Sequence, residues 1–444
     1  MRRTSAASTV RGRVADRGAL RRVIEDTGAD ALLVVGATSR DPDLLPFTGE
    51  TRLGDCFVLA RADGVRWLGY HSVIEREEAA ATGLALLDPA TLRVADVIVG
   101  GRGSRLARSL GIALRRAKLP GRRVAIAGRY PNGDLAQALA QLRHQGFRFT
   151  SGHDAVLRLR RPKRGAELDE IRGVAAATNR ALRGVARILS EAGRSTRRSK
   201  AEGRSSARRK GRRARGPAVG PELVWRGGAL TVGVVRREVA ATFAAAGLDQ
   251  PEGNLIAPGR QGAVPHNTGD PSSVLRAGES LIVDLFPRRR LHADCTRTFC
   301  VGAAPPELLA AHRAVLDALV LARERARVGT RGFAIQEEVC RHFEALGYPT
   351  SLQRPVTAGY VHGLGHGVGF EVHELPHFRR DGALDQGILE RDDVFTLEPG
   401  LYDPEAGYGV RLEDLCRLGP GGVEILTPLP YDLDPRAWPR DDGA

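Results

Sequence analysis

Long apolar runs are missing from this chain of 444 residues, and cysteines are few. No stretch approaches the roughly 18 apolar residues of a membrane-spanning helix, so a membrane-spanning protein is excluded. The five cysteines are odd in number, scattered, and form no CxxC pair. This usage argues against a disulfide framework and favours a reducing, cytoplasmic setting. The N-terminus lacks the apolar segment of a secretory signal, and we expect a frayed tail there although transit peptides share its Arg and Ser content.

Outside one segment the chain also lacks a strong charge imbalance. The net charge is +15, but residues 193–216 hold eleven Lys or Arg and one Glu, so most of the excess lies there. This basic insert has almost no apolar content, which predicts a disordered, solvated loop. Weak, salt-sensitive contact with nucleic acid or another anionic surface is the alternative. Because no aromatic residue is interleaved, specific single-strand recognition is disfavoured.

Strand and helix patterns alternate over the first 150 residues, which predicts a small α/β domain that we place at 1–155. Apolar runs predict strands at 31–35, 56–60, 65–70 and 124–127, and helices at 104–118 and 135–145. Residues 100–103 are rich in glycine but have neither GxGxxG nor Walker spacing, so we expect a loop. This part of the chain contains no cluster of catalytic residue types.

The remainder mixes helices with hairpins, which predicts an α+β domain at 156–435 with the basic insert inside it. A helix is expected from 167 to 192, followed after the insert by a hairpin of strands at 281–286 and 292–301. Further helices are expected at 306–328 and 332–346, and strands at 394–397 and 409–415.

Two acids occur in the predicted hairpin, and buried acids need a partner. Asp284 follows three apolar residues in its strand, and Asp294 lies in the returning strand. Because Asp is rarely buried unpaired and two carboxylates repel each other, a cation is expected between or beside them. The residues leave two choices, a structural ion pair with Arg297 or a metal ion.

Four of the eleven histidines lie within residues 362–377, beside a run of glycines that would let the backbone approach a ligand. Glu398 and Glu413 follow apolar strand residues further along. Two Asp, two Glu and a His in such positions favour a metal site over separate structural roles. Residues 373–377 also fit HExxH, but Pro376 is incompatible with the helix that this zinc motif requires, so we discount it.

At this point the sequence resembles the pita-bread metallopeptidases, which include methionine aminopeptidase, aminopeptidase P, prolidase and the metal-free creatinase. The resemblance covers about residues 160–432, where 294–298 read DCTRT, 362–366 read HGLGH, 398–400 read EPG and 411–413 read RLE. The first 150 residues resemble, more weakly, the creatinase-type N-terminal domain. The resemblance therefore implies a pita-bread catalytic domain after a smaller α/β domain.

The resemblance also implies two divalent metal ions and assigns their ligands. Asp284 would bind one ion, Asp294 and Glu413 would bridge both, and His366 and Glu398 would complete the second ion's ligands. Carboxylates with one imidazole favour Mn²⁺, with Co²⁺ or Zn²⁺ as alternatives. Such a pair of ions would hold a hydroxide as nucleophile, with Glu398 as a proton shuttle.

Four further residues take roles from the resemblance, each with a plainer alternative as a hydrogen-bonded or supporting residue. His266 would face the substrate, His362 would shape the pocket, and His373 would stabilise the tetrahedral intermediate or protonate the leaving amine. Arg411 matches an arginine of the proline-specific branch. The spacing from Asp284 to Asp294 is one residue shorter than usual, so either the turn accommodates it or the hairpin has a bulge.

The leading hypothesis is a cytoplasmic, dimeric metallopeptidase that cleaves Xaa-Pro bonds at peptide N-termini. Aminopeptidase P and prolidase cannot be separated on these residues, whereas methionine aminopeptidase normally lacks the N-terminal domain. The alternative is a non-catalytic protein of this fold that uses the basic insert to bind nucleic acid or a partner. A creatinase-like amidinohydrolase is disfavoured because that branch loses the metal ligands.

Overall fold

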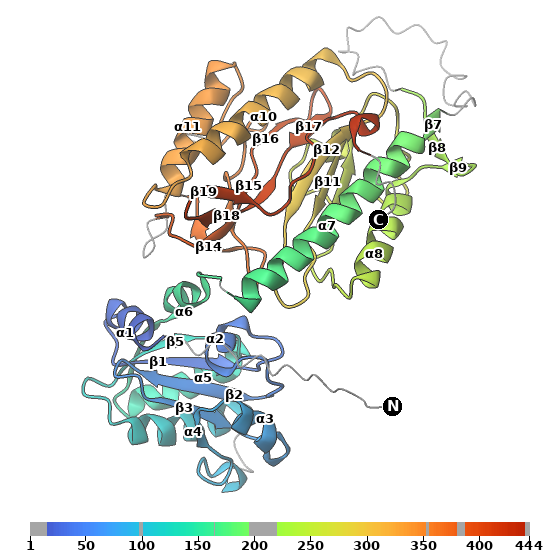
Figure 1. The fold of residues 1–444 in the computed structure, drawn as a ribbon. Coiled ribbons are helices and arrows are strands. Elements are labelled where there is room, and N and C mark those ends of the chain that lie inside the picture. Colours follow the sequence, from blue (N-terminus) through green and yellow to red (C-terminus); the bar gives the residue numbers. More distant parts are fainter. Residues whose placement is uncertain are drawn as a thin grey trace, which may run out of the picture. The chain divides into compact units, whose positions relative to one another are not determined.

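The computed structural model describes residues 16–96, 101–163, 165–194, 220–351, 355–379 and 387–439. The chain divides into two compact units, Met1–Pro162 and Lys163–Ala444 (Figure 1). The predicted boundary after residue 155 falls inside helix α6 (His153–Arg160), whose apolar side packs into the first unit's core. The expected N-terminal tail and residues 195–216 of the basic insert lie outside the described residues; Gly193–Arg194 form the short strand β7.

A six-stranded sheet with the strand order β4-β3-β2-β1-β5-β6 forms the centre of the first unit. Its strands are β1 (Ala31–Gly36), β2 (Cys56–Arg61), β3 (Arg66–Tyr70), β4 (Ala85–Leu87), β5 (Arg123–Ala127) and β6 (Arg148–Ser151). Only β2 among these runs antiparallel to its neighbours. The predicted hairpin of β2 and β3 is confirmed.

Helices cover both faces of this sheet because alternate residues of β1 point to opposite sides. Leu32 and Val34 pack with α1 (Arg17–Asp26) and α6, whereas Leu33 and Val35 pack with α4 (Gly101–Ala117) and α5 (Asn132–His144). Short helices α2 (Leu45–Thr48) and α3 (Arg76–Ala81) complete the unit. The prediction of a loop at 100–103 is wrong for its last three residues, which form the first turn of α4.

The second unit begins with the long helix α7 (Ala166–Glu191), which packs against α8 (Val232–Ala245). A three-stranded antiparallel sheet follows, made of β10 (Leu255–Pro258), β11 (Ser280–Leu285) and β12 (Cys295–Cys300). The short helix α9 (Gly259–Gly262) and the strands β8 (Leu223–Trp225) and β9 (Gly228–Ala229) lie between these elements. The predicted returning strand at 292–301 is shorter in the structure, because pairing resumes only at Cys295.

The second half of this unit packs helices α10 (Pro306–Arg325) and α11 (Gly332–Ala345) beside a five-stranded sheet (Figure 1). That sheet has the order β14-β13-β15-β18-β19, with β13 (His366–Gly367), β14 (Glu374–His377), β15 (Val394–Leu397), β18 (Asp414–Gly419) and β19 (Gly422–Ile425). A separate hairpin joins β16 (Gly400–Asp403) to β17 (Tyr408–Arg411). The single strand predicted at 409–415 is therefore two strands, β17 and β18, with Leu412 and Glu413 between them.

Helices and largely antiparallel sheets are mixed in the second unit, as the α+β prediction requires. One apolar core lies between α10, α11 and the strands β15 to β18. It includes Val315, Phe343, Phe395 and Cys416. The described helices include none that is both long enough and apolar enough to cross a membrane.

Candidate metal centre

The β11–β12 hairpin brings both predicted aspartates to one face of the sheet. Asp284 pairs with Thr296, and the same register continues to the bridge between Arg288 and His292 at the turn. Side chains two residues apart on a strand share a face, so Asp294 lies on the same side as Thr296 and Asp284. The paired residues contain no bulge, so the tight turn accommodates the short spacing.

Glu413 reaches this face from the break between β17 and β18. Its backbone N–H donates to the Thr296 carbonyl oxygen at 3.0 Å, and the Thr296 hydroxyl donates to its Oε2 at 2.7 Å. Thr298, two residues further along β12, accepts from the Arg411 backbone N–H at 3.0 Å. These bonds fix the end of β17 and the carboxylate of Glu413 against β12.

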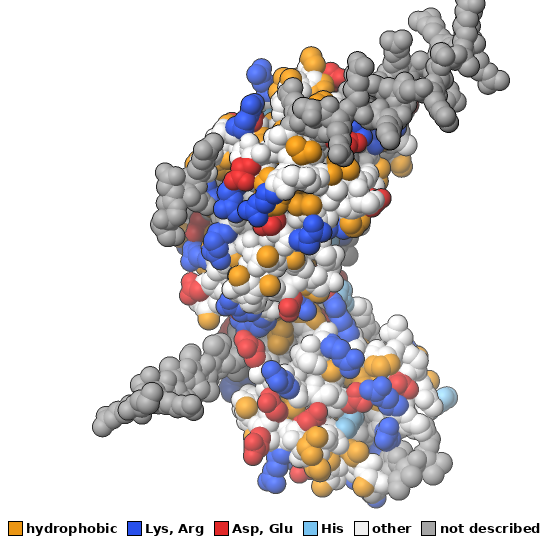
Figure 2. Space-filling view, turned by 90° about the vertical axis from the view of Figure 1, so that its right-hand side faces the viewer, with side chains coloured by type: hydrophobic (Ala, Val, Ile, Leu, Met, Phe, Trp, Pro, Cys, Tyr) orange, Lys and Arg blue, Asp and Glu red, His pale blue; other side chains and the backbone are white. Residues whose placement is uncertain are grey.

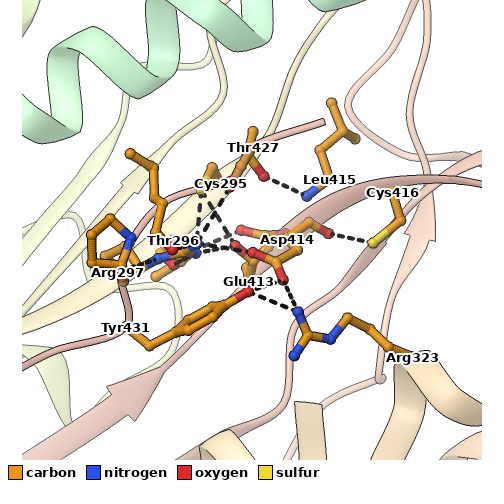
Figure 3. A network of polar contacts seen from close by, with 12 residues as sticks. Cys295, Thr296, Arg297, Arg323, Glu413, Asp414, Leu415, Cys416, Thr427 and Tyr431 are labelled. Carbon is orange, nitrogen blue, oxygen red and sulfur yellow. Dashed lines mark hydrogen bonds and ion pairs between the residues drawn. The ribbon is translucent and has the colours of Figure 1, made fainter. Parts of the chain in front are cut away.

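Arg297 points to the opposite face and lies in a buried polar network behind the acids (Figure 3). Its Nη2 is 2.9 Å from Asp414 Oδ1, and its Nη1 donates to the Glu413 carbonyl oxygen at 2.5 Å. Arg323 and Tyr431 hold the other oxygen of Asp414 at 3.3 and 2.7 Å. The suggested ion pair of Arg297 with Asp284 or Asp294 is therefore wrong, because strand alternation turns its side chain away.

His366, in β13, directs one ring nitrogen toward the acids. Its Nδ1 is 3.1 Å from the Gly367 carbonyl oxygen, which is the arrangement of an Nδ1–H donor. Its Nε2 then lies 3.2 Å from Glu398 Oε1 and 3.9 Å from Asp294 Oδ2. A backbone carbonyl that orients the ring in this way is typical of histidines that bind metals through the other nitrogen.

The buried acids do not satisfy one another. Burial, together with repulsion from neighbouring carboxylates, raises the pKa of Asp294 and of Glu413 well above the ordinary range. Oδ1 of Asp284 and Oδ1 of Asp294 are buried and accept no hydrogen bond from the described residues. Buried carboxylate oxygens without a hydrogen bond are unfavourable unless a cation binds them.

The donor atoms are spaced as a metal ion would need. Asp294, His366 and Glu413 each offer one ligand atom, and these three atoms lie within 4.8 Å of one another. Glu398 lies against His366: burial opposes its ionisation, but the hydrogen bond and charge of the protonated His366 ring, together with the charges of His362 and Arg411, more than offset burial and lower its pKa to about 2 in the absence of metal. A cluster of carboxylates with one imidazole fits a divalent cation.

Arg411 supplies a fixed positive charge at one side of the cluster. Its Nη2 is 2.5 Å from Asp284 Oδ2, its Nε donates to Thr296 Oγ1 at 3.2 Å, and its Nη1 donates to the Tyr402 hydroxyl at 3.1 Å. Tyr402 is also 2.9 Å from His362 Nε2. The sequence did not single out Tyr402, because one buried tyrosine in a strand has no chemical signature; its link to Arg411 comes from the pairing of β16 with β17.

A cavity of about 490 Å³ joins these groups to solvent. It is lined by the five proposed ligands and by His266, His362, His373 and Arg411, so every predicted site residue reaches it. The His373 ring lies 4.3 Å from that of His366, and burial together with that neighbour lowers its pKa to about 4. Glu252, His377 and Arg379 also line the cavity, and no role was predicted for them.

The structure agrees with the decision to discount the HExxH motif. Glu374–His377 form strand β14 rather than a helix, so His373 and His377 do not occupy one helical face. Cys295 and Cys416 lie near the acids in sequence but are buried and free, as expected of small core residues. His266 is exposed at the mouth of the cavity.

Comparison with solved structures shows a shared fold across nearly the whole chain. The prolidase from Pyrococcus horikoshii OT3 superposes with a TM-score of 0.67 at 19% identity, covering 94% of this chain and 99% of that one. The X-Pro aminopeptidase from Thermotoga maritima MSB8 gives 0.63 at 21% identity, covering 93% and 99%. The predicted pita-bread fold, preceded by a smaller α/β domain, is confirmed.

Sequence comparison agrees but covers less of the chain. The Xaa-Pro dipeptidase of Pyrococcus furiosus is 31% identical over 210 residues, which are 46% of this chain and 57% of that protein. The aligned region thus spans little more than half of that relative. A model described as metallopeptidase family M24 matches residues 169–419. Since this match covers more than half of the chain and contains the whole acidic cluster, the chain belongs to metallopeptidase family M24.

Proposed function

We propose that this protein is a dinuclear metallopeptidase that hydrolyses Xaa-Pro bonds, with Xaa-Pro dipeptides as its preferred substrates. One observation carries the proposal: two aspartates, two glutamates and a histidine from five separate segments converge in one buried cluster, and Arg411, which pairs with Asp284, balances only part of its negative charge. Because the chain belongs to metallopeptidase family M24, we infer that divalent metal ions bind to this cluster. The name of the Pyrococcus furiosus relative, Xaa-Pro dipeptidase, supports the choice of bond.

Asp284, Asp294, His366, Glu398 and Glu413 would hold the two ions. When bound, the ions would polarise the scissile carbonyl and activate water as the nucleophile, so no Ser or Cys is needed. The chain's own contribution is to fix the carboxylates. Thr296 fixes Glu413, the Gly367 carbonyl fixes His366, and Arg411 fixes Asp284. Preorganised groups of this kind need no rearrangement as charge develops.

Proton transfer falls to groups at the edge of the cluster. Glu398 shares a hydrogen bond with His366 and would carry a proton from the attacking water toward the leaving nitrogen. Burial lowers the pKa of His373, which favours the neutral ring as a hydrogen-bond donor to the oxyanion over the alternative role of a proton donor to the leaving amine. His362, held by Tyr402, and the exposed His266 border the same cavity.

The charges lining the cavity favour a short zwitterionic substrate. Glu252 offers a carboxylate that could receive a free α-amino group, and Arg379 offers a guanidinium that could receive a free carboxylate. A dipeptide carries both charges on the two residues that flank the scissile bond, whereas a longer peptide carries its carboxylate further from that bond. This is the reason for preferring a dipeptidase to an aminopeptidase that acts on longer peptides.

We further propose Mn²⁺ as the metal, a homodimer and a cytoplasmic location. The oxygen-rich donor set supports Mn²⁺, with Co²⁺ or Zn²⁺ as alternatives. Nucleic-acid contact through the basic insert stays a prediction, because nearly all of that segment lies outside the described residues. On the face seen in Figure 2, Lys and Arg side chains are interspersed with Asp and Glu, which does not favour an extended nucleic-acid interface there.

The decisive experiment measures metal content together with cleavage. The purified chain, its Asp294→Ala variant and the matched control Asp317→Ala, an exposed acid of α10, are compared. Substrates are an Xaa-Pro dipeptide and an Xaa-Pro-Yaa tripeptide with added Mn²⁺. We expect up to two ions per chain and dipeptide cleavage in the wild type and the control, and loss of both in Asp294→Ala. Cleavage of the tripeptide alone would support the aminopeptidase, and absence of metal and cleavage would support the non-catalytic alternative.

A second test needs no activity. If Asp294 is buried among like charges only to bind a cation, Asp294→Asn should raise the thermal midpoint in excess chelator and lower it in excess Mn²⁺. A purely structural aspartate would lower the midpoint in both conditions. Asp317→Asn should change neither value.

A further inference from the structure

A second cavity, of about 140 Å³, lies in the first unit. Its polar lining residues are Asp55, His71, Arg102, Arg105, Ser109 and Tyr130. None of these residues belongs to the metal centre, which lies entirely within the second unit.

The strand directions place this cavity at the end of the six-stranded sheet where the parallel strands finish. His71 directly follows β3, Tyr130 follows β5 after a short connection, and Asp55 directly precedes the antiparallel strand β2. Cys56 pairs with Tyr70 and with Gly36, so these ends coincide. The cavity therefore lies outside the carboxyl ends of the parallel strands, which is where open α/β sheets bind ligands.

One side of the cavity is fixed by paired groups. Arg102 binds Asp55 through two hydrogen bonds, Nε to Oδ2 at 3.0 Å and Nη2 to Oδ1 at 2.5 Å. The Tyr130 hydroxyl lies 3.3 Å from the same carboxylate, and the guanidinium of Arg102 lies over its ring. The charges of Arg102 and Asp55 cancel, and the three side chains form a rigid wall.

The other side presents groups that the described chain leaves without a partner. His71 Nε2 is buried and makes no hydrogen bond with the described residues. Arg105, one turn along α4 from Arg102, makes no ion pair or hydrogen bond within the described residues. Burial lowers the pKa of His71; the charge of Asp55 opposes this shift, and the charges of Arg105 and Arg102 add to it. The exposed Arg105 therefore brings an unbalanced positive charge to the cavity, and an unsatisfied ring nitrogen of His71 lies buried in the cavity wall.

We propose that this cavity is a binding site for a small oxyanion, with Arg105 and His71 as its principal contacts. Arg105 supplies the charge-assisted hydrogen bonds, and His71 Nε2, as the N–H tautomer, becomes a further donor when the ring turns toward the bound ion. The wall of Arg102, Asp55 and Tyr130 holds the shape of the site. The position in α4's first turns adds the favourable field of a helix N-terminus.

The size of the cavity limits the ligand. A water molecule occupies about 30 Å³ in the liquid, so the cavity holds the equivalent of a few waters. Inorganic phosphate or the carboxylate group of a short organic acid fits that space, and the cavity is smaller than the pockets of about 300–1,000 Å³ that hold drug-sized ligands. Phosphate and carboxylate share the chemistry recognised here, and the experiment separates them.

The test uses the metal-loaded full chain and two probes, inorganic phosphate and acetate. Histidine ring resonances are recorded during titration, and that of His71 is assigned with His71→Gln. We expect one probe or both to shift the His71 signal saturably. Arg105→Gln should weaken that binding at least tenfold, whereas Arg108→Gln, an exposed arginine of the same helix outside the cavity, should leave it unchanged.

Each outcome with the two probes and the two variants either supports or overturns the proposal. Saturation by phosphate alone supports a phosphate site, and saturation by acetate supports a carboxylate site. No shift of the His71 signal with either probe overturns the proposal, as does equal binding in the Arg105 and Arg108 variants. Because the signal belongs to His71, binding of either probe at the metal centre does not affect the outcome, and Xaa-Pro cleavage should be unchanged in both arginine variants.

Discussion

A buried lysine behind the metal centre gives the sharpest prediction about stability. Lys163 Nζ lies 3.0 Å from Glu374 Oε2, and the two side chains are 0% and 1% exposed. Glu374 directly follows His373, and its other oxygen accepts from the Glu371 backbone N–H at 3.2 Å. The ion pair thus fixes the segment that carries His373 to the start of the second unit.

Replacing Lys163 with Met removes a buried positive charge 3.0 Å from Glu374 Oε2 and leaves that carboxylate buried. Breaking a buried ion pair from one side costs about 3–5 kcal/mol, because the remaining charge is not solvated. The double variant Lys163→Met/Glu374→Met should recover most of this loss, since apolar residues of similar volume can replace such pairs at little cost. The exposed pair of Arg172 with Glu424, at 2.7 Å, provides the control. There, Arg172→Met should cost no more than about 1 kcal/mol.

Urea unfolding of the metal-loaded chain, followed by circular dichroism, measures these differences as the shift of the second unit's transition. Cleavage of an Xaa-Pro dipeptide is measured in parallel below the transition. A loss in Lys163→Met no larger than in Arg172→Met would refute the reasoning, as would a double variant no more stable than the single one. If the double variant is stable but its kcat stays low, the pair also positions His373, which a purely structural role would not produce.

Three further predictions concern the site and its surroundings. Thr296→Val removes the hydroxyl that orients Glu413 and should reduce Mn²⁺ affinity about 10- to 100-fold with little change in the thermal midpoint, measured by metal titration. In Gly400→Ala the new Cβ would lie 2.7 Å from the Tyr402 hydroxyl; displacement of that ring should lower kcat more than it changes metal content, and full kcat would contradict the assigned contact. His312 has a lowered pKa because burial disfavours its charged form, so its stabilising contribution is complete above about pH 6.5 and is lost as the pH falls below that value. The fall in unfolding free energy below pH 6.5 should therefore be shallower in His312→Gln, and an unchanged slope would contradict this.

The candidate metal centre could be predicted from the sequence where its residues lie close together along the chain. Asp284 and Asp294 lie on one hairpin, and an acid in an apolar strand is informative by itself. The outlines of the long helices α7, α10 and α11 were predictable for a similar reason, because their apolar spacing is sustained over several turns. Strand ends near the site were less accurate, since Asp294 and Glu413 lie where regular pairing stops.

The partner of the buried acids was harder to predict, although part of the answer was present in the sequence. Arg297 is three residues from Asp294, and an odd separation along a strand places two side chains on opposite faces. Alternation alone could therefore have excluded it. The arginine that contacts Asp284 is Arg411, and the distance of more than a hundred residues between them reflects the packing of β17 on β11, which no local pattern reveals.

The glycines at 363–369 have a different physical role from the one that the sequence suggested. The sequence suggested that these glycines let a ligand approach the backbone. In the structure, a Cβ at Gly365 would overlap the Thr396 carbonyl oxygen, and one at Gly367 would overlap that of Leu375. A Cβ at Gly369 would overlap Lys163 and Glu374, whereas Gly363 alone of the four has open space around it. Three of the four glycines are therefore required by the neighbouring strands and the buried ion pair, and they act on the metal centre by allowing β13 to hold His366 in place.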